Sequence, residues 1–198
     1  MGRIGFLDLP LVTPEAQMIF DEDIAEDGYV MNVSRLWAYN PALVTGLFGL
    51  MGDAISEHKL SFRHRGILVA ACASTLGDSY CSLAWGSKLA GVSDPDIAAA
   101  VIRGTDEGLT DEDRALASWA RKVAKDPNGT TTQDVEVLRS AGFNDAQVFA
   151  ITAFVALRIA FSTVNDALGV GPDAALRATA PRQIVDAIGF GRSAGDSD

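Results

Sequence analysis

The residues that could do chemistry gather in one short stretch of the chain. Between Leu60 and Gly91 lie both cysteines, Cys72 and Cys81, and one of the two histidines, His64. A thiol reacts as a nucleophile only in its thiolate form, so the surroundings of each cysteine decide what it can do. Cys81 follows a predicted helix start, whereas Cys72 lies on an alanine-rich apolar face that is typical of a core position. Cys81 is therefore the candidate reactive thiol.

An aspartate marks the start of the helix that carries Cys81. The residues Gly77-Asp78-Ser79 predict the end of one helix and the start of the next, with Cys81 about one turn inside. A carboxylate at Asp78 would raise the pKa of the Cys81 thiol, because like charges disfavour ionisation. Two interpretations of Asp78 stay open: it caps the helix, or it exchanges protons with Cys81.

Aromatic and basic side chains flank this centre. Trp85 follows Cys81 by one helical turn and Tyr80 directly precedes it, so each could line a pocket or pack in the core. His64 is followed by Arg65 on a basic helical turn, and it is the only histidine close enough in sequence to serve as a base. Arg65 could hold an anion. For His64, an ordinary surface position is the alternative.

Other roles are also open for the cysteines. Cys81 can be a small buried side chain without chemistry, or it can form a disulfide with Cys72, which requires Cα atoms within about 7 Å. The histidines His58 and His64 and the isolated cysteines do not match the spacing of a zinc site. A glycine-rich phosphate loop and a GxSxG elbow are also missing from the sequence. We therefore expect neither a metal nor another cofactor.

The elements that must position these residues are predicted to be helices. Apolar residues at helical spacing, together with capping residues, predict helices over residues 14–26, 41–58, 61–76, 78–90, 93–103, 111–125, 133–141, 146–168 and 182–188. The helix over 146–168 has the composition of a bundle centre or a subunit interface. No segment shows the alternation of a strand, so the predicted class is all-α, a bundle built from helical hairpins.

Composition and charge narrow the function. With 198 residues, 48% hydrophobic and 21% charged, the chain is expected to fold as a single domain. A net charge of -10 disfavours binding to nucleic acid and to anionic membranes. Two cysteines are too few for a secreted disulfide framework, and the N-terminus lacks the pattern of a signal peptide. A cytoplasmic location is expected.

The segment LSFRHRGILVAACASTLGDSYCSLAWGSKLAG resembles the alkylhydroperoxidase AhpD and carboxymuconolactone decarboxylase family. The likeness to its peroxidase-related branch extends over residues 3–175 through LPLVTPEAQMIFD, NPALVTGLFGLMGDAI, LTDEDRALASWARKVAKDP and VNDALGV. The resemblance implies a single AhpD-like domain over residues 1–198. Its parts would be an N-terminal helical extension (1–58), a motif-bearing core (59–175) and a flexible tail (190–198). It also implies a homo-oligomer, a trimer or a hexamer.

The resemblance also shows which catalytic parts are replaced. Family members with peroxidase activity have a Glu, then a CxxC motif, then a His. Their positions correspond here to Gly66 for the Glu, Asp78 and Cys81 for the two cysteines, and Trp85 for the His. Since the resolving thiol and the proton-moving groups are absent from these positions, the peroxidase relay is expected to be dismantled. Lactone decarboxylation is not transferred either, because it also needs the Glu and the His.

We therefore predict an AhpD-like protein that acts on or binds a small organic molecule in a non-redox role. The catalytic candidates are Cys81, His64 and Asp78, and the substrate-binding candidates are Arg65, Tyr80 and Trp85. One alternative is a weak one-cysteine alkylhydroperoxidase, in which an external thiol resolves oxidised Cys81. The other is a non-catalytic ligand-binding or oligomeric member.

Overall fold

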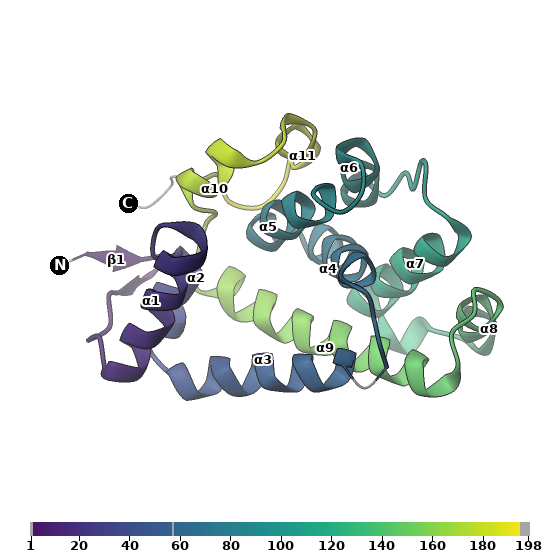
Figure 1. Ribbon diagram of the computed structural model, residues 1–198, viewed down its shortest axis with the longest axis horizontal. Helices are drawn as coiled ribbons and strands as arrows, with labels where there is room; N and C mark the ends of the chain where they lie inside the picture. The colour runs from purple at the N-terminus through teal and green to yellow at the C-terminus, as the bar shows by residue number, and fades with distance from the viewer. Residues whose placement is uncertain (1, 57, 195–198) are drawn as a thin grey trace.

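Helices form nearly all the regular structure in the computed structural model, which describes residues 2–56 and 58–194 (Figure 1). The all-α prediction is confirmed. The elements are β1 (Arg3–Ile4), β2 (Leu7–Asp8), α1 (Pro14–Asp27), α2 (Asn32–Trp37), α3 (Pro41–Ser56), α4 (Phe62–Leu76), α5 (Ser79–Ala90), α6 (Pro95–Arg103), α7 (Asp111–Lys125), the 3₁₀ helix η1 (Pro127–Gly129), α8 (Thr132–Ser140), α9 (Asp145–Ala167), α10 (Ala174–Thr179) and α11 (Arg182–Ala187).

The predicted helices are present, and their ends differ from the predictions by a residue or two. Thr131, and not Thr132, caps α8, because the Thr131 hydroxyl accepts the Asp134 N–H while the Asp134 carboxylate accepts the Thr131 N–H. Asp94, and not Ser93, caps α6 by accepting the N–H of Asp96. The antiparallel β1–β2 pair, α2 and α10 were not predicted, since they are too short to show a period.

The long helix α9 lies at the centre of the packing. It runs alongside α3 in the opposite direction, with the α4–α5 hairpin on its other side (Figure 1). Among the described residues, α9 is the one helix long and apolar enough to cross a membrane by length and composition. It packs against α3, α4, α7 and α8, as the core helix of a soluble protein does.

A tight turn joins α4 to α5 and places the cysteine-bearing turn against α9. Gly77 ends α4 with a φ of 78°, a left-handed conformation that glycine adopts without steric cost. Asp78 then begins α5 as its N-cap. The two helices approach closely at Gly66, where a Cβ atom would lie 3.2 Å from the Cβ of Leu89.

Part of the segment predicted as a flexible tail, residues 190–198, makes contacts with the rest of the chain. The Ser79 hydroxyl donates to the carbonyl of Arg192 (2.8 Å) and accepts from the Arg192 N–H (3.0 Å). Phe190 packs against the core. Residues 190–194 are therefore held against α5, and residues 195–198 lie outside the described residues.

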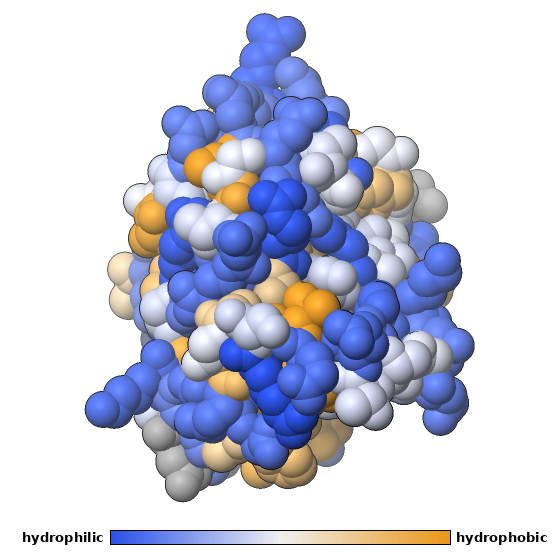
Figure 2. Space-filling view, turned by 90° about the vertical axis from the view of Figure 1, so that its right-hand side faces the viewer, coloured by the Kyte–Doolittle hydropathy of each residue, from blue (hydrophilic) through white to orange (hydrophobic). Residues whose placement is uncertain are grey.

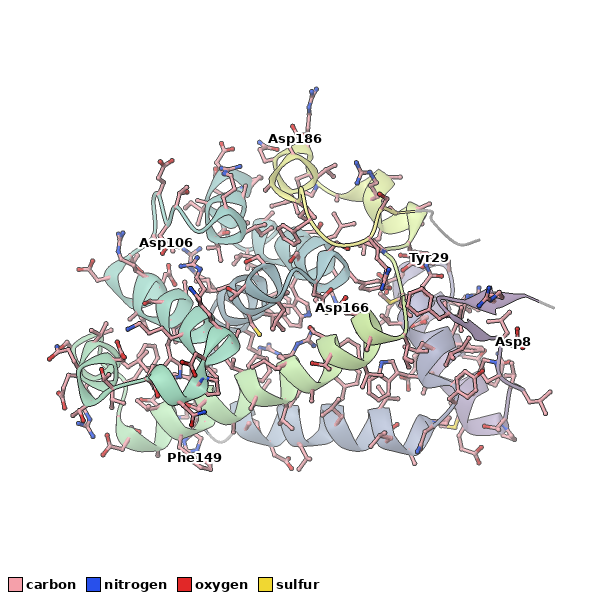
Figure 3. The ribbon with its side chains drawn as sticks, turned by 180° about the vertical axis from the view of Figure 1, so that it is seen from behind. Asp8, Tyr29, Asp106, Phe149, Asp166 and Asp186 are labelled. Atoms are coloured by element: carbon pink, nitrogen blue, oxygen red, sulfur yellow. The ribbon has the colours of Figure 1, made fainter. Side chains whose placement is uncertain are left out.

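Large apolar side chains are exposed on the N-terminal segment, on α1, on α3 and at one end of α9. The end of the molecule near α7 and α8 is mostly hydrophilic, with small apolar islands (Figure 2). On α3, Leu43 and Leu50 are each 57% exposed, and Phe149 is 74% exposed at the end of α9 that is labelled in Figure 3. The outer face of α3 is thus an apolar surface that the described part of the chain leaves open.

Candidate functional site

The Cys81 side chain borders a cavity of about 360 Å³ between α5, α9 and the N-terminal helices α1 to α3. Cavities of this size fall within the roughly 300–1,000 Å³ typical of small-molecule sites. Its walls combine aliphatic and polar residues with five aromatic ones, and Arg158 contributes a positive charge. The aromatic residues are Trp37, Phe48, Tyr80, Trp85 and Phe161. The turn at Gly77 thus places Cys81 beside a hollow between helices.

Two charged neighbours flank the Cys81 thiol. The Cys81 N–H donates to Oδ1 of Asp78 over 2.8 Å, and the sulfur accepts a hydrogen bond from Nη2 of Arg158 over 3.2 Å. Asp78 is fully buried and Arg158 is only 4% exposed. The Asp78 carboxylate at the start of α5 therefore raises the pKa of the Cys81 thiol, whereas the Arg158 guanidinium of α9 lowers it.

The balance of these effects keeps Cys81 protonated at neutral pH. Burial raises the pKa of the Cys81 thiol far above its ordinary value, the Asp78 charge raises it further, and Arg158 lowers it. Burial also raises the pKa of Cys72, to about 12. Both cysteines are free, so the Cys72–Cys81 disulfide considered from the sequence is not formed.

Asp78 is the N-cap of α5, which confirms one of the two interpretations of this residue. Its Oδ1 atom accepts the Cys81 N–H, while its Oδ2 atom is buried without a hydrogen-bond partner among the described residues. Ser82 Oγ and Asn165 Nδ2 are buried and unpartnered in the same way. Capping therefore uses one carboxylate oxygen and leaves the other available beside the thiol.

Tyr80 and Trp85 both line the cavity, and they also pack within the fold. The Tyr80 hydroxyl donates to the carboxylate of Asp173, and burial together with the Asp173 charge raises the pKa of Tyr80 far above its ordinary value. The centroid of the Trp85 ring lies 5.5 Å from the guanidinium carbon of Arg158. It lies at the same distance, 5.5 Å, from Nζ of Lys88. The Tyr80 side chain is thus held in place by a hydrogen bond, and Trp85 lies beside two positive charges.

The structure does not bring His64 or Arg65 to Cys81, which corrects the sequence-based interpretation. The His64 Nε2 atom lies 3.3 Å from Oε1 of Glu112, and the Arg65 guanidinium covers the ring of Phe62 at 5.0 Å. Both residues start α4, and the antiparallel α4–α5 hairpin places that end opposite Leu89, far along α5 from Cys81. Neither residue lines the cavity, so the roles of base and anion clamp at Cys81 do not fit them.

Arg158 is the functional residue that the sequence analysis did not identify. Its guanidinium contacts the Cys81 sulfur and lies over the rings of Trp85 (5.5 Å) and Phe161 (5.1 Å). The one signal in the sequence is a single arginine within the apolar run AFVALRIAF. A charged residue in the middle of an apolar helix is seldom fully buried unless it has a partner or a function.

The position of Gly66 has no room for a longer side chain. A Cβ atom there would lie 3.1 Å from Cδ1 and 3.2 Å from Cβ of Leu89. A glutamate at this position would therefore require α4 and α5 to move apart.

No group of three or more His, Cys, Asp and Glu side chains in residues 2–56 and 58–194 could hold a metal ion.

Solved structures share this architecture over almost the whole chain. An uncharacterized peroxidase-related protein from Silicibacter sp. aligns at 26% identity and a TM-score of 0.77, covering 87% of this chain and 93% of that one. An AhpD-core, uncharacterized peroxidase-related protein from Ralstonia eutropha aligns at 22% identity and a TM-score of 0.79, covering 89% and 96%.

A third similar structure is that of an enzyme. The debrominase Bmp8 aligns at 18% identity and a TM-score of 0.71, covering 88% of this chain and 92% of its own. A further Bmp8 structure, of a cysteine-to-alanine variant in complex with 2,3,4-tribromopyrrole, aligns at 19% identity and a TM-score of 0.70, covering 91% and 96%. No protein-family model matches the sequence, and no curated protein sequence matches it.

Proposed function

We propose, from the premise that this chain is AhpD-like, that its cavity binds a small planar organic molecule beside a neutral Cys81 thiol, in a non-redox role. One observation carries this proposal. Cys81 lines a cavity that contains five aromatic residues and no second cysteine, and Cys72 is a free, buried core residue. A relay that oxidises one thiol and resolves it with a neighbour has no second member here.

The state of the thiol also favours a non-redox role. A peroxidase needs a thiolate, whereas burial and Asp78 raise the pKa of Cys81 far above neutral pH. A neutral thiol can donate a hydrogen bond or a proton to a bound molecule. The unpartnered Oδ2 atom of Asp78 lies in the same buried region and can accept a hydrogen bond from the neutral thiol or from a bound molecule.

The aromatic walls support a planar ligand. The rings of Trp37 and Phe161 are stacked at 5.3 Å with an interplanar angle of 6°, and Phe48 lies 5.3 Å from Phe161. Aromatic side chains bind flat rings through stacking and through burial of apolar area. The Bmp8 complex contains an aromatic ring, 2,3,4-tribromopyrrole, which supports the same size class of ligand for this fold.

A one-cysteine peroxidase is the second candidate, and the contact between Arg158 and Cys81 favours it. A guanidinium beside the sulfur stabilises a thiolate. The reaction would convert the thiolate and a hydroperoxide, after proton uptake, into a sulfenic acid and an alcohol, and an external thiol would then form a mixed disulfide with release of water. Consumption of a hydroperoxide with added thiol, lost in Cys81→Ser, would support this candidate over the first.

The first candidate is tested by binding and not by turnover. Small planar aromatic compounds are screened by ligand-observed NMR against the wild-type protein, Cys81→Ala and Trp85→Ala. We expect binding that survives Cys81→Ala and weakens by roughly tenfold or more in Trp85→Ala, because Trp85 lines the cavity. Phe149→Ala, at an exposed position of α9, is the matched control. Absence of binding, or binding that Trp85→Ala leaves unchanged, contradicts the proposal.

We also propose that copies of the chain associate, through a surface that includes the outer face of α3. The exposed Leu43 and Leu50, which lie on the same side of α3, support this, because exposed apolar surface often marks an interface. The trimer or hexamer implied by the family resemblance is the expected state. Sedimentation of the protein as a monomer at micromolar concentration contradicts it.

The two free thiols support the proposal of a cytoplasmic location.

A further inference from the structure

Arg158 is a buried charge without an acidic partner in the described part of the chain. It is 4% exposed, and none of the seven ion pairs among the described residues includes it. Asp78, which also neighbours Cys81, accepts the Cys81 N–H and makes no hydrogen bond to Arg158. Buried charges in proteins are normally paired, since an isolated one loses its hydration without compensation. Arg158 therefore has no directly bonded acid group among the described residues, and the nearest buried carboxylate in this region, Asp78, lies beside the same thiol without pairing with it.

The guanidinium is presented to the cavity. Arg158 lines the cavity, its Nη2 atom donates only to the neutral Cys81 sulfur, and its Nε atom is buried without a partner. The guanidinium carbon lies over the rings of Trp85 and Phe161, at 5.5 Å and 5.1 Å from their centroids. Donors in the plane of a guanidinium form paired hydrogen bonds with the two oxygens of an acid group.

The other charges of the cavity orient a ligand. Glu22 and Asp23 of α1 line the cavity, and so does Lys88 of α5. Glu22 and Lys88 are exposed, whereas Asp23 is half-buried with its carboxylate accepting the N–H of Met31 at 2.9 Å. The buried positive charge thus belongs to Arg158 alone among the cavity residues. An anionic group is attracted to that inner end and away from the carboxylates of α1.

We propose that the ligand of this cavity is a small aromatic anion, whose acid group pairs with Arg158 and whose ring lies along Trp85 and Phe161. The inference rests on the proposed function, because it assigns a chemical class to the molecule that the cavity binds. It makes Arg158 the residue that determines specificity for charge, while the aromatic walls determine specificity for shape. An anion without a ring would pair only with Arg158, and a ring without an acid group would contact only the aromatic side chains.

The test compares three probes by isothermal titration calorimetry: benzoate, the neutral benzamide of similar shape, and inorganic sulfate. We expect the wild-type protein to bind benzoate roughly tenfold or more tightly than either of the others. Arg158→Met should reduce the benzoate affinity to that of benzamide and leave benzamide binding unchanged. Arg182→Met, at a position where the side chain is 90% exposed, is the matched control and should change neither affinity.

The outcomes separate this inference from the proposed function. Benzamide that binds as tightly as benzoate overturns the anion assignment and leaves an aromatic site in place. A benzoate preference that survives Arg158→Met overturns the pairing of the acid group with Arg158. Sulfate that binds as tightly as benzoate overturns the aromatic part. Absence of binding by both ring compounds overturns the inference together with the proposed function. If Arg158→Met does not fold, the ratio of the two wild-type affinities still decides, because a preference below twofold overturns the assignment.

Discussion

The Nη2 atom of Arg158 donates a hydrogen bond to the Cys81 sulfur over 3.2 Å and so links α9 to the first turn of α5. On the helix of Cys81 itself, Asp78 caps the same turn through the Cys81 N–H. The acidity of this thiol is therefore set by two residues of opposite charge, and each can be removed separately.

The rate of alkylation of Cys81 should report this balance. Since the thiol pKa is raised above its usual range, iodoacetamide should modify native Cys81 slowly at pH 7 and faster with rising pH. Asp78→Asn keeps the cap and removes the charge, so it should speed modification several-fold, and Arg158→Met should slow it. Peptide mass spectrometry at a series of pH values measures the rates. A native rate at pH 7 equal to that of the urea-unfolded protein would refute the elevated pKa.

Restoring a side chain at Gly66 should destabilise the fold. A Cβ atom there would meet Leu89 at 3.1 and 3.2 Å, so Gly66→Ala should lower the free energy of unfolding by about 1–3 kcal/mol. Gly49→Ala, in α3 with no atom within 4 Å of the added Cβ, is the control and should raise it by about 0.5–1 kcal/mol. Urea denaturation measures both. Equal shifts in the two variants would show that α4 and α5 do not meet at Gly66.

A partly buried ion pair between α4 and α7 should contribute measurably to stability. Arg63 Nε and Nη2 donate to Oδ2 of Asp113 at 3.1 and 2.7 Å, and the Asp113 side chain is only 3% exposed. Arg63→Ala leaves that carboxylate buried without its partner, and it should lower the free energy of unfolding by about 2–3 kcal/mol. Arg182→Ala, which removes an exposed pair with Asp186, should cost less than about 0.5 kcal/mol. If Arg63→Ala lowers the free energy of unfolding as little as the control does, the Asp113 carboxylate must be hydrated and not buried.

Helix positions were predictable because their signals are local. The side chains of Thr13, Ser61, Thr110 and Asn144 each accept an N–H of the first turn, as their residue types and neighbours predict. The short helix α2 has no side-chain cap, so its sequence carries no such signal.

The site was less predictable because its contacts are long-range. Arg158 and Cys81 are 77 residues apart, and nothing in the sequence near Cys81 indicates the arginine. His64 is close to Cys81 in sequence, which predicted a role as a base. In the α4–α5 hairpin, however, it lies at the end opposite the sulfur and contacts Glu112. The cap at Asp78 and the cavity wall at Trp85, by contrast, follow from helical spacing alone.

The last prediction concerns Asp166, which lies toward the C-terminal end of α9 (Figure 3). Burial raises the pKa of its carboxyl to about 7, the Asp78 charge adds to this, and Arg192 opposes it. Between about pH 4 and 7, the folded protein then holds a proton on Asp166 that the unfolded chain has lost. The free energy of unfolding should therefore fall as the pH rises through this window, by at most about 1.4 kcal/mol per pH unit.

Asp166→Asn removes this titration, so it should flatten the decline, and its advantage over the wild-type protein should grow from pH 4 to pH 8. Urea denaturation across this range measures the difference, and Asp186→Asn, at an exposed position, is the control. Because the Asp78 charge contributes to the raised pKa of Asp166, Asp78→Asn should shift the wild-type decline to lower pH. A difference between Asp166→Asn and wild type that stays constant with pH would mean that Asp166 titrates as an ordinary surface carboxylate. In that case its link to the buried charge beside Cys81 would be absent.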